Sequence, residues 1–199
     1  MPLSYTPITE LEAVNAMLEM VSAAPVSSLP DSGVSEAYLA RSILHRVSRE
    51  IQSMGWSFNT DENYELSPNS NGFIILPTNV LRIDATYRGD DYVPRYDSTD
   101  SKMKLYNKAE HTFIFSSPVK VDVVWFFPWD GLPDHVRNYV YIKAARQFQV
   151  RFQTNEGMHK FTEADELYAR AEMLSTEFMQ DDDTLFYSPE TMLIIKRRL

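Results

Sequence analysis

The chain has 199 residues, 44% of them apolar and 13% aromatic, which is enough to bury a core in one domain of ordinary size or in two small ones. It has no cysteine, so disulfides, thiolate metal sites and cysteine nucleophiles are excluded. The formal net charge of -9 argues against a sequence-independent DNA clamp, because such binding comes largely from Lys and Arg. We expect a soluble protein made in a cytoplasm, since the sequence shows neither a positively charged leader nor an apolar window of about 18 residues.

A first amphipathic helix is predicted from Thr9 to Ala24. Thr9 and Glu12 have the spacing of a capping box, in which each side chain bonds the backbone N–H of the other residue. Ala24 precedes Pro25, and proline disfavours the helical conformation in the residue before it. The apolar face of this helix comprises Leu11, Val14, Leu18 and Val21.

A second, longer helix is predicted to end at Gly55, with Gln52 off its apolar face. A glycine just past the last apolar position can adopt the left-handed conformation that closes a helix. Trp56 and Phe58 follow directly, and we expect them to anchor a joint between two parts of the fold, with 59–63 as a turn into the first strand. The apolar face comprises Ala37, Ala40, Leu44, Val47, Ile51 and Met54.

From Trp56 to about Pro133 apolar and polar residues alternate, which is the period of a β-strand. The clearest alternation runs through 80–87 and 119–125, and turn-rich segments separate shorter candidates. The pattern predicts a compact antiparallel unit of hairpins. The shorter candidate strands are 63–66, 72–76, 92–96, 103–107 and 112–115.

Helical spacing resumes after Pro133, with one helix predicted over 133–152 and another over 161–179. Each predicted helix has one apolar face that must be buried. The apolar faces of these two comprise Val136, Val140, Ala144, Phe148 and Phe152 in the first, and Ala164, Leu167, Ala171, Leu174 and Phe178 in the second.

Two helices therefore precede the strands and two follow them. The sequence predicts an α+β fold, in which an antiparallel β domain is inserted between the second and third helices of a four-helix bundle, with an extended C-terminal tail. The predicted bundle comprises 1–56 and 131–180, the β domain 57–130 and the tail 181–199.

Motifs of catalysis and cofactor binding are absent from the sequence. It has no glycine-rich phosphate loop, no zinc-binding His pair and no G-x-S-x-G elbow, so no catalytic, metal or cofactor residue is predicted. The four histidines are isolated in the sequence and are interpreted as surface or capping residues. They are His45, His111, His135 and His159.

Carboxylates leave one enzymatic alternative, because a glycan hydrolase needs only two acids roughly 5 to 10 Å apart. Aspartates are more commonly turn residues, for local hydrogen-bonding reasons. The candidate sets are Asp61 and Glu62 beside Trp56, or Asp84, Asp90 and Asp91 with Tyr87 and Tyr92.

Charge is segregated along the chain. From Gln153 to Asp183 there are nine acidic residues and two basic ones, whereas the second and third helices are rich in arginine. Such faces can pair between neighbouring copies or within one bundle. The tail ends in an apolar run followed by cations, which can dock on a partner or fold back on the β domain. These tail residues are Met192, Leu193, Ile194, Ile195, Lys196, Arg197 and Arg198.

Four segments occur in the order "ELEAVNAML", "PVSSL", "ARSILHRVSREIQSMGWSFNTDEN" and "LPDHVRNYVYIKAARQFQVRF". Their combination resembles the tail tubular protein A family, the gatekeepers or head-to-tail adaptors of short-tailed phages of the autographivirus group. The segments cover the first three predicted helices and the joints between them.

The resemblance implies a structural virion protein of the tail and no cofactor. It implies a ring of twelve copies between the portal protein and the tail nozzle protein, tail tubular protein B, with double-stranded DNA passing through the lumen without specific binding. The isolated chain can then be a monomer that forms the ring on the portal, where the tail residues named above would dock. The alternative function is a tail-associated hydrolase of polysaccharides that uses the acids of the β domain.

Overall fold

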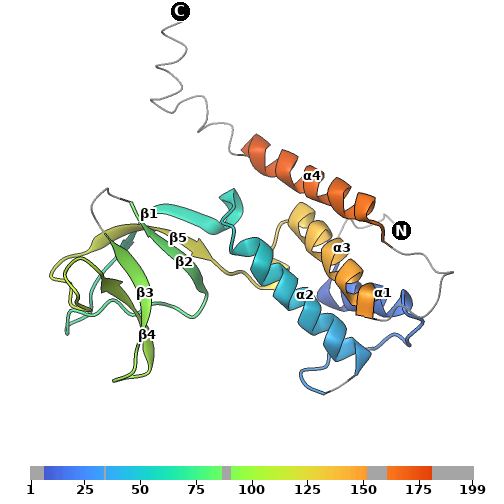
Figure 1. The fold of residues 1–199 in the computed structure, drawn as a ribbon, viewed down its shortest axis with the longest axis horizontal. Coiled ribbons are helices and arrows are strands. Elements are labelled where there is room, and N and C mark those ends of the chain that lie inside the picture. Colours follow the sequence, from blue (N-terminus) through green and yellow to red (C-terminus); the bar gives the residue numbers. More distant parts are fainter. Residues whose placement is uncertain (1–6, 34, 87–90, 152–160, 181–199) are drawn as a thin grey trace, which may run out of the picture. The chain divides into compact units, whose positions relative to one another are not determined.

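The computed structural model describes residues 7–33, 35–86, 91–151 and 161–180 (Figure 1). Helices and antiparallel strands follow one another in the order α1, α2, β1 to β5, α3, α4, with short 3-10 turns before β1 and after β5, so the fold is of the α+β type. The described residues form two compact units. The helical unit combines the segment up to Ser48 with the segment from Pro128 onward, and the β unit is Arg49–Phe127.

The first helix, α1, spans Glu10–Glu19 and begins with the predicted capping box. The Thr9 hydroxyl oxygen accepts from the N–H of Glu12 at 3.2 Å, and the Glu12 carboxylate accepts from the N–H of Thr9 at 2.8 Å. The predicted end at Ala24 is wrong. The chain leaves the helix at Met20 and turns at Ser22, whose φ is 58°, before Pro25 can act.

The second helix, α2, spans Glu36–Gln52, and its last turn belongs to the β unit. Gly55 has a φ of 79° and donates its N–H to the carbonyl oxygen of Gln52 at 3.2 Å, so the predicted left-handed glycine is present. The helix itself ends at Gln52, three residues before Gly55. Met54 is therefore outside the helix and half exposed. The buried apolar residues of the predicted face are Ala37, Ala40, Leu44, Val47 and Ile51.

The third helix, α3 (Asp134–Arg151), packs against both α1 and α4 (Glu163–Gln180). Four predicted residues of its apolar face are buried, and Phe152 lies outside the described residues. Two polar contacts join α3 to α4. Arg146 pairs with Glu166, and the Nε2 atom of His135 lies 2.7 Å from the Glu177 carboxylate. None of the helices among the described residues is long and apolar enough to cross a membrane.

The predicted apolar face of α4 is wrong. The residues that α4 buries are Ala169, Met173 and Glu177, because this side of the helix packs against α3. The predicted face, which includes Leu167 and Phe178, is on the solvent side of the helix.

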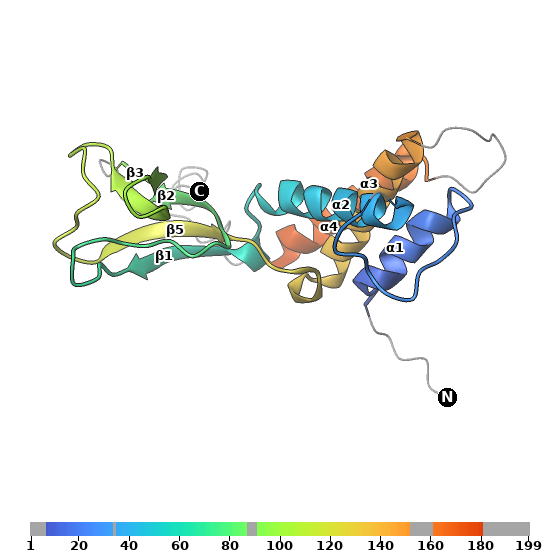
Figure 2. The same ribbon diagram turned by 90° about the horizontal axis from the view of Figure 1, so that it is seen from below.

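The β unit contains two antiparallel sheets. One has the strand order β1-β5-β2, so the strand that is last in sequence lies in the centre (Figure 2). The other pairs β3 with β4 (Figure 1). The strand bounds are β1 Thr60–Leu66, β2 Val80–Ala85, β3 Tyr92–Asp97, β4 Lys102–Asn107 and β5 Val119–Trp125. The buried core of the unit comprises Ile74, Leu76, Ile83, Leu105, Phe115, Val121 and Val123.

Three predicted segments differ from the structure. The turn predicted over 59–63 is wrong, because β1 already begins at Thr60 and only a bulge interrupts its pairing with β5 between Asp61 and Tyr64. The candidates 72–76 and 112–115 form isolated bridges instead of strands. Their alternation nevertheless buries Ile74 and Phe115 in the core.

Candidate functional site

The chain enters and leaves the β unit through two segments, 49–59 and 125–127, which we call the junction. The buried side-chain amide of Gln52, at the end of α2, binds the backbone of Phe127 twice. Its Nε2 donates to the carbonyl oxygen at 3.1 Å and its Oε1 accepts from the N–H at 2.8 Å. A primary amide carries both donor and acceptor atoms, so one glutamine side chain can bond the N–H and the carbonyl oxygen of the same residue. Gln52 is 0% exposed, so this pairing holds in the absence of competing water.

Asn59 completes the junction from the short 3-10 turn Ser57–Asn59. Its Nδ2 donates to the carbonyl oxygens of Gln52 at 2.9 Å and Trp125 at 2.7 Å, and its Oδ1 accepts from the N–H of Trp56 at 2.8 Å. One buried amide therefore serves three backbone groups. Buried backbone groups without partners are costly, so this network fixes the chain at both ends of the β unit.

The predicted joint residues lie within this network. Trp56 is half-buried and its Nε1 donates to the carbonyl oxygen of Ile51 at 2.7 Å, which ties the indole to the end of α2. Phe58 is half-buried. A Cβ atom on Gly55 would lie 3.1 Å from Arg82 Nη2 and 3.2 Å from Val124 Cγ2, so a larger residue would press on the sheet.

Sequence reasoning missed both amides that carry the junction. Gln52 was placed on the polar side of α2, yet it is buried, because the helix ends there and the β unit covers it. The sequence places Asn59 at the start of the turn into the first strand, and nothing in its pattern predicts the burial of its side chain. The one signal in the sequence is that Gln52 directly follows Ile51, the last apolar residue of the helix. A glutamine at that position is equally compatible with an exposed side chain.

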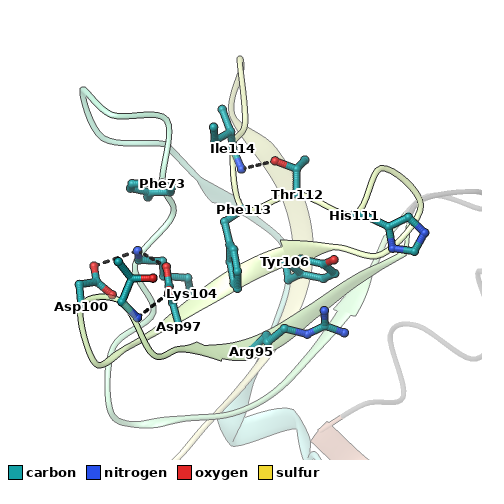
Figure 3. Close-up of a pocket in the computed structure, with 11 residues that line it drawn as sticks. Phe73, Arg95, Asp97, Asp100, Lys104, Tyr106, His111, Thr112, Phe113 and Ile114 are labelled. Carbon is teal, nitrogen blue, oxygen red and sulfur yellow. Dashed lines mark hydrogen bonds and ion pairs between the residues drawn. The ribbon is translucent and has the colours of Figure 1, made fainter.

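One face of the β3–β4 hairpin carries an open cavity of about 650 Å³ (Figure 3). At one end Lys104 is 2% exposed, and its Nζ lies 2.8 Å from a carboxylate oxygen of Asp97 and of Asp100. The same Nζ lies 4.0 Å from the centre of the Phe73 ring. The remaining lining residues are Arg95, Thr99, Tyr106, His111, Thr112, Phe113 and Ile114.

The charge of Lys104 is paired with two carboxylates in this cavity. The hydrogen bond from Lys104 lowers the pKa of Asp97 to about 2, with further help from Thr99. Hydrogen bonds to Asp100 and Asp97 raise the pKa of Lys104. At the other end the Arg95 guanidinium stacks on Tyr106, 3.7 Å from the ring centre. The arrangement rigidifies the hairpin, and the shifted pKa values of Asp97 and Lys104 keep both groups charged at neutral pH, so this pair offers no general acid or base there.

The first candidate acid set does not assemble as a cleft around Trp56. Asp61 accepts a hydrogen bond of 2.7 Å from the indole Nε1 of Trp125. Glu62 is exposed on β1, and the Trp56 indole is engaged with Ile51. These residues have structural partners or face solvent.

The second set is also engaged in pairs. Asp84 pairs with Arg82 at 2.8 Å, Asp91 pairs with Lys108 at 2.8 Å, and Tyr92 packs edge-on against Phe115. Tyr87 and Asp90 lie outside the described residues. No described member of either set lines the hairpin cavity.

Metal-binding groups of three or more His, Asp or Glu side chains are not found in the parts of the chain that the structure describes. His45 lies 2.7 Å from Glu10, His135 contacts Glu177, and His111 lines the cavity. His159 and the tail residues 192–198 are outside the described residues. Some of the segregated charges pair within one chain, because Arg146 of α3 forms an ion pair with Glu166 of α4.

Comparison with known proteins gives one family. The family described as tail tubular protein matches residues 11–183, which include the whole β unit, helices α2 to α4 and all of α1 except its first residue. Tail tubular protein A of Klebsiella phage KP34 is 37% identical over 132 residues, which are 66% of this chain and 66% of that protein. The match therefore spans just under two thirds of that relative's length.

Among solved structures, the neck of an empty GTA particle, computed with C6 symmetry, is similar over 85% of this chain and 93% of that chain. The identity is 14% and the TM-score is 0.31.

Proposed function

The chain belongs to the tail tubular protein family and is thus a structural component of a bacteriophage tail, and from this we propose that it is the head-to-tail adaptor of a short-tailed phage. The match over residues 11–183 is the observation that carries the proposal. In the proposed assembly twelve copies form a ring between the portal protein and the tail nozzle protein. Double-stranded DNA passes through the lumen.

A ring suits the chemistry of this chain. A contact between two different surfaces of the same chain, repeated by rotation, closes into a cylinder and needs no catalytic residue. The net charge of -9 makes the protein a poor ligand for phosphates, so DNA would pass without being held. Among the candidate acids that the structure describes, Asp61, Asp84 and Asp91 are engaged with Trp125, Arg82 and Lys108 instead of lining a shared cleft, which does not favour the hydrolase alternative.

We further propose that the helical unit is a four-helix bundle and that the β unit is an insertion between its second and third helices. The order of elements and the packing of α3 against α1 and α4 support this arrangement. Gly55, Trp56 and Phe58 would then form the interdomain joint, reinforced by Gln52 and Asn59 of the junction. The tail residues Met192 to Arg198 would dock on the portal.

Cryo-electron microscopy of the purified chain mixed with its portal protein tests the proposal. A ring of this protein on the tail-side face of the portal is expected. The mass of the chain with and without the portal gives the number of copies. A portal that remains bare at saturating protein would refute the proposed function.

A further inference from the structure

Helix α4 has one buried side and, opposite to it, an exposed side that is apolar. One side, with Ala169 and Met173, packs against α3. The opposite side, which we call the outer face, contains no charged residue, although a solvent-facing helix surface is normally polar. The outer face comprises Ala164, Leu167, Tyr168, Ala171, Leu174, Ser175, Phe178 and Met179.

Exposure of this face is high. Leu167 is 59%, Tyr168 76%, Phe178 60% and Met179 74% exposed. Within the helical unit, α3 lies along one side of α4, and no described element covers the other (Figure 1). Contiguous exposed apolar surface of this kind marks an interaction site, whereas single exposed apolar residues are ordinary.

We propose that a second copy of this chain covers the outer face of α4, and that it does so with a patch formed by the C-terminal end of α3 and the adjoining part of α2. This inference rests on the proposed function, because it names the contact that would repeat around the ring. The patch contains Val150, 65% exposed, beside exposed Arg151. Arg46 of α2 belongs to it, since its Nη2 donates to Gln147, one turn before Arg151, at 2.7 Å.

Charge complementarity supports this occupant. Helix α4 carries five acidic residues and one arginine, and exposed Glu163 and Glu172 border its outer face. The patch offers the opposite combination, an exposed apolar side chain together with the exposed arginines Arg46 and Arg151. Complementary borders of this kind fix orientation and suppress wrong pairings.

The chain's own continuation beyond α4 matches the outer face less well than a second copy does. Residues 181–183 are three aspartates that directly follow this acidic helix. Like charges would oppose the return of that segment along α4.

The proposed contact joins two different surfaces, the outer face of one copy and the patch of the next. It is therefore heterologous and repeats around the ring in one rotational direction.

The first experiment introduces charge into the outer face. The full chain with Leu167→Glu and Phe178→Glu should keep its helical circular dichroism signal, because both side chains are exposed. Its self-association, measured by sedimentation alone and with portal protein, should weaken at least about tenfold, because charges would be buried in an apolar contact. Tyr96→Glu, at a similarly exposed position of β3 in the β unit, is the matched control. Unchanged association of the double variant would overturn the inference.

The second experiment uses the absence of native cysteine. Leu167→Cys chains are mixed with Val150→Cys chains and treated with a short bifunctional thiol cross-linker, with and without portal protein. A covalent pair containing one chain of each kind is expected. Thr78→Cys, exposed in the β unit, replaces Val150→Cys as the control and should give only collisional background.

The outcomes separate the two claims. Pairs between Leu167→Cys chains alone would show that α4 packs on α4, which contradicts the heterologous contact. If rings form on the portal without the mixed pair, the inference fails and the proposed function stands. If no ring forms but the mixed pair does, the contact stands and the adaptor role fails. Absence of the mixed pair under both conditions overturns the inference.

Discussion

The side chain of Asn59 holds the last residue of β5, Trp125, by a hydrogen bond of 2.7 Å from its Nδ2 to the backbone carbonyl oxygen. The same nitrogen bonds the carbonyl oxygen of Gln52 at 2.9 Å, and Asn59 is 1% exposed. A single polar side chain thereby joins the segment that enters the β unit to the segment that leaves it.

Asn59→Ala should lower the free energy of unfolding by about 3 kcal/mol. It leaves two carbonyl oxygens and the N–H of Trp56 without their partner in a buried setting, where each such group costs roughly 1 to 3 kcal/mol. Urea denaturation measures the change. Asn79→Ala, at an exposed position of the same unit, should stay within about 0.5 kcal/mol of the unmodified protein. Equal losses in both variants would contradict the role of Asn59.

Gly55→Val should destabilise the protein by more than about 2 kcal/mol. A β-branched residue is strained at the φ of 79°, and its Cβ would lie 3.2 Å from Val124 Cγ2. Gly55→Asn should cost less, because asparagine tolerates the left-handed region. Thermal unfolding of both variants gives the order. A Val variant as stable as the Asn variant would show that the backbone conformation is not what selects glycine here.

The order of helices and strands was predictable, because the hydrophobic period changes from about 3.6 to 2 and back. The buried face of α2 and the capping box at Thr9 also followed from local spacing. The ends of α1 and α2 did not, since Ser22 and the contacts of Gln52 depend on tertiary structure. Periodicity cannot say what covers a face, and for this reason the prediction for α4 selected the side without a partner in the chain.

The polar residues of the junction could not be predicted from the sequence. Gln52 and Asn59 are residue types that are mostly exposed in proteins, and only the return of β5 beside them makes their burial favourable. Lys104 is a similar case. Its burial between Asp97, Asp100 and Phe73 depends on a hairpin register that the alternation alone does not fix.

The stability of the β unit should depend on pH through Asp97 and Lys104. The folded pKa of Asp97, about 2, is below the ordinary aspartate value of 3.8, so its contribution to the stability of the fold is complete above about pH 4 and is lost as the pH falls through 2. The pKa of Lys104 is raised above 10.5, so its contribution is complete below that value and is lost at higher pH. The urea midpoint of the unmodified protein should exceed that of Asp97→Asn at pH 6, and the difference should shrink between pH 4 and 2.

Asp84→Asn is the control for this series, because its ion pair with Arg82 is exposed. The midpoint of this variant should stay close to that of the unmodified protein at each pH. A gap between Asp97→Asn and the unmodified protein that stays constant down to pH 2 would refute the coupling.

Purified protein should release no reducing ends from capsular or starch-like glycans. The described carboxylates proposed for such a reaction are paired with Trp125, Arg82 and Lys108 or face solvent. A reducing-end assay over several hours measures this. Release that disappears in Asp61→Asn or Asp84→Asn would restore the hydrolase alternative, whereas release that persists in both would indicate a contaminating enzyme.

Substitution of Ile194 and Ile195 by serine should weaken binding to the portal protein at least about tenfold, because the proposed docking buries these apolar side chains. Surface plasmon resonance with immobilised portal measures the affinity. Thr191→Ala, just before the apolar run, is the control and should bind as the unmodified chain does. Equal affinity of the serine variant would exclude the docking role of the tail.

The paired hydrogen bonds between Gln52 and Phe127 join residues 75 positions apart. The segment between these two residues is therefore equivalent to a loop whose two ends are held together by the hydrogen bonds. Closing a free loop of that length costs about 2 kcal/mol more than closing a turn of about five residues, since each doubling adds about 0.6 kcal/mol. A folded β unit removes that cost, so insertions in its hairpins can lengthen this segment with little entropic penalty for the helices on either side.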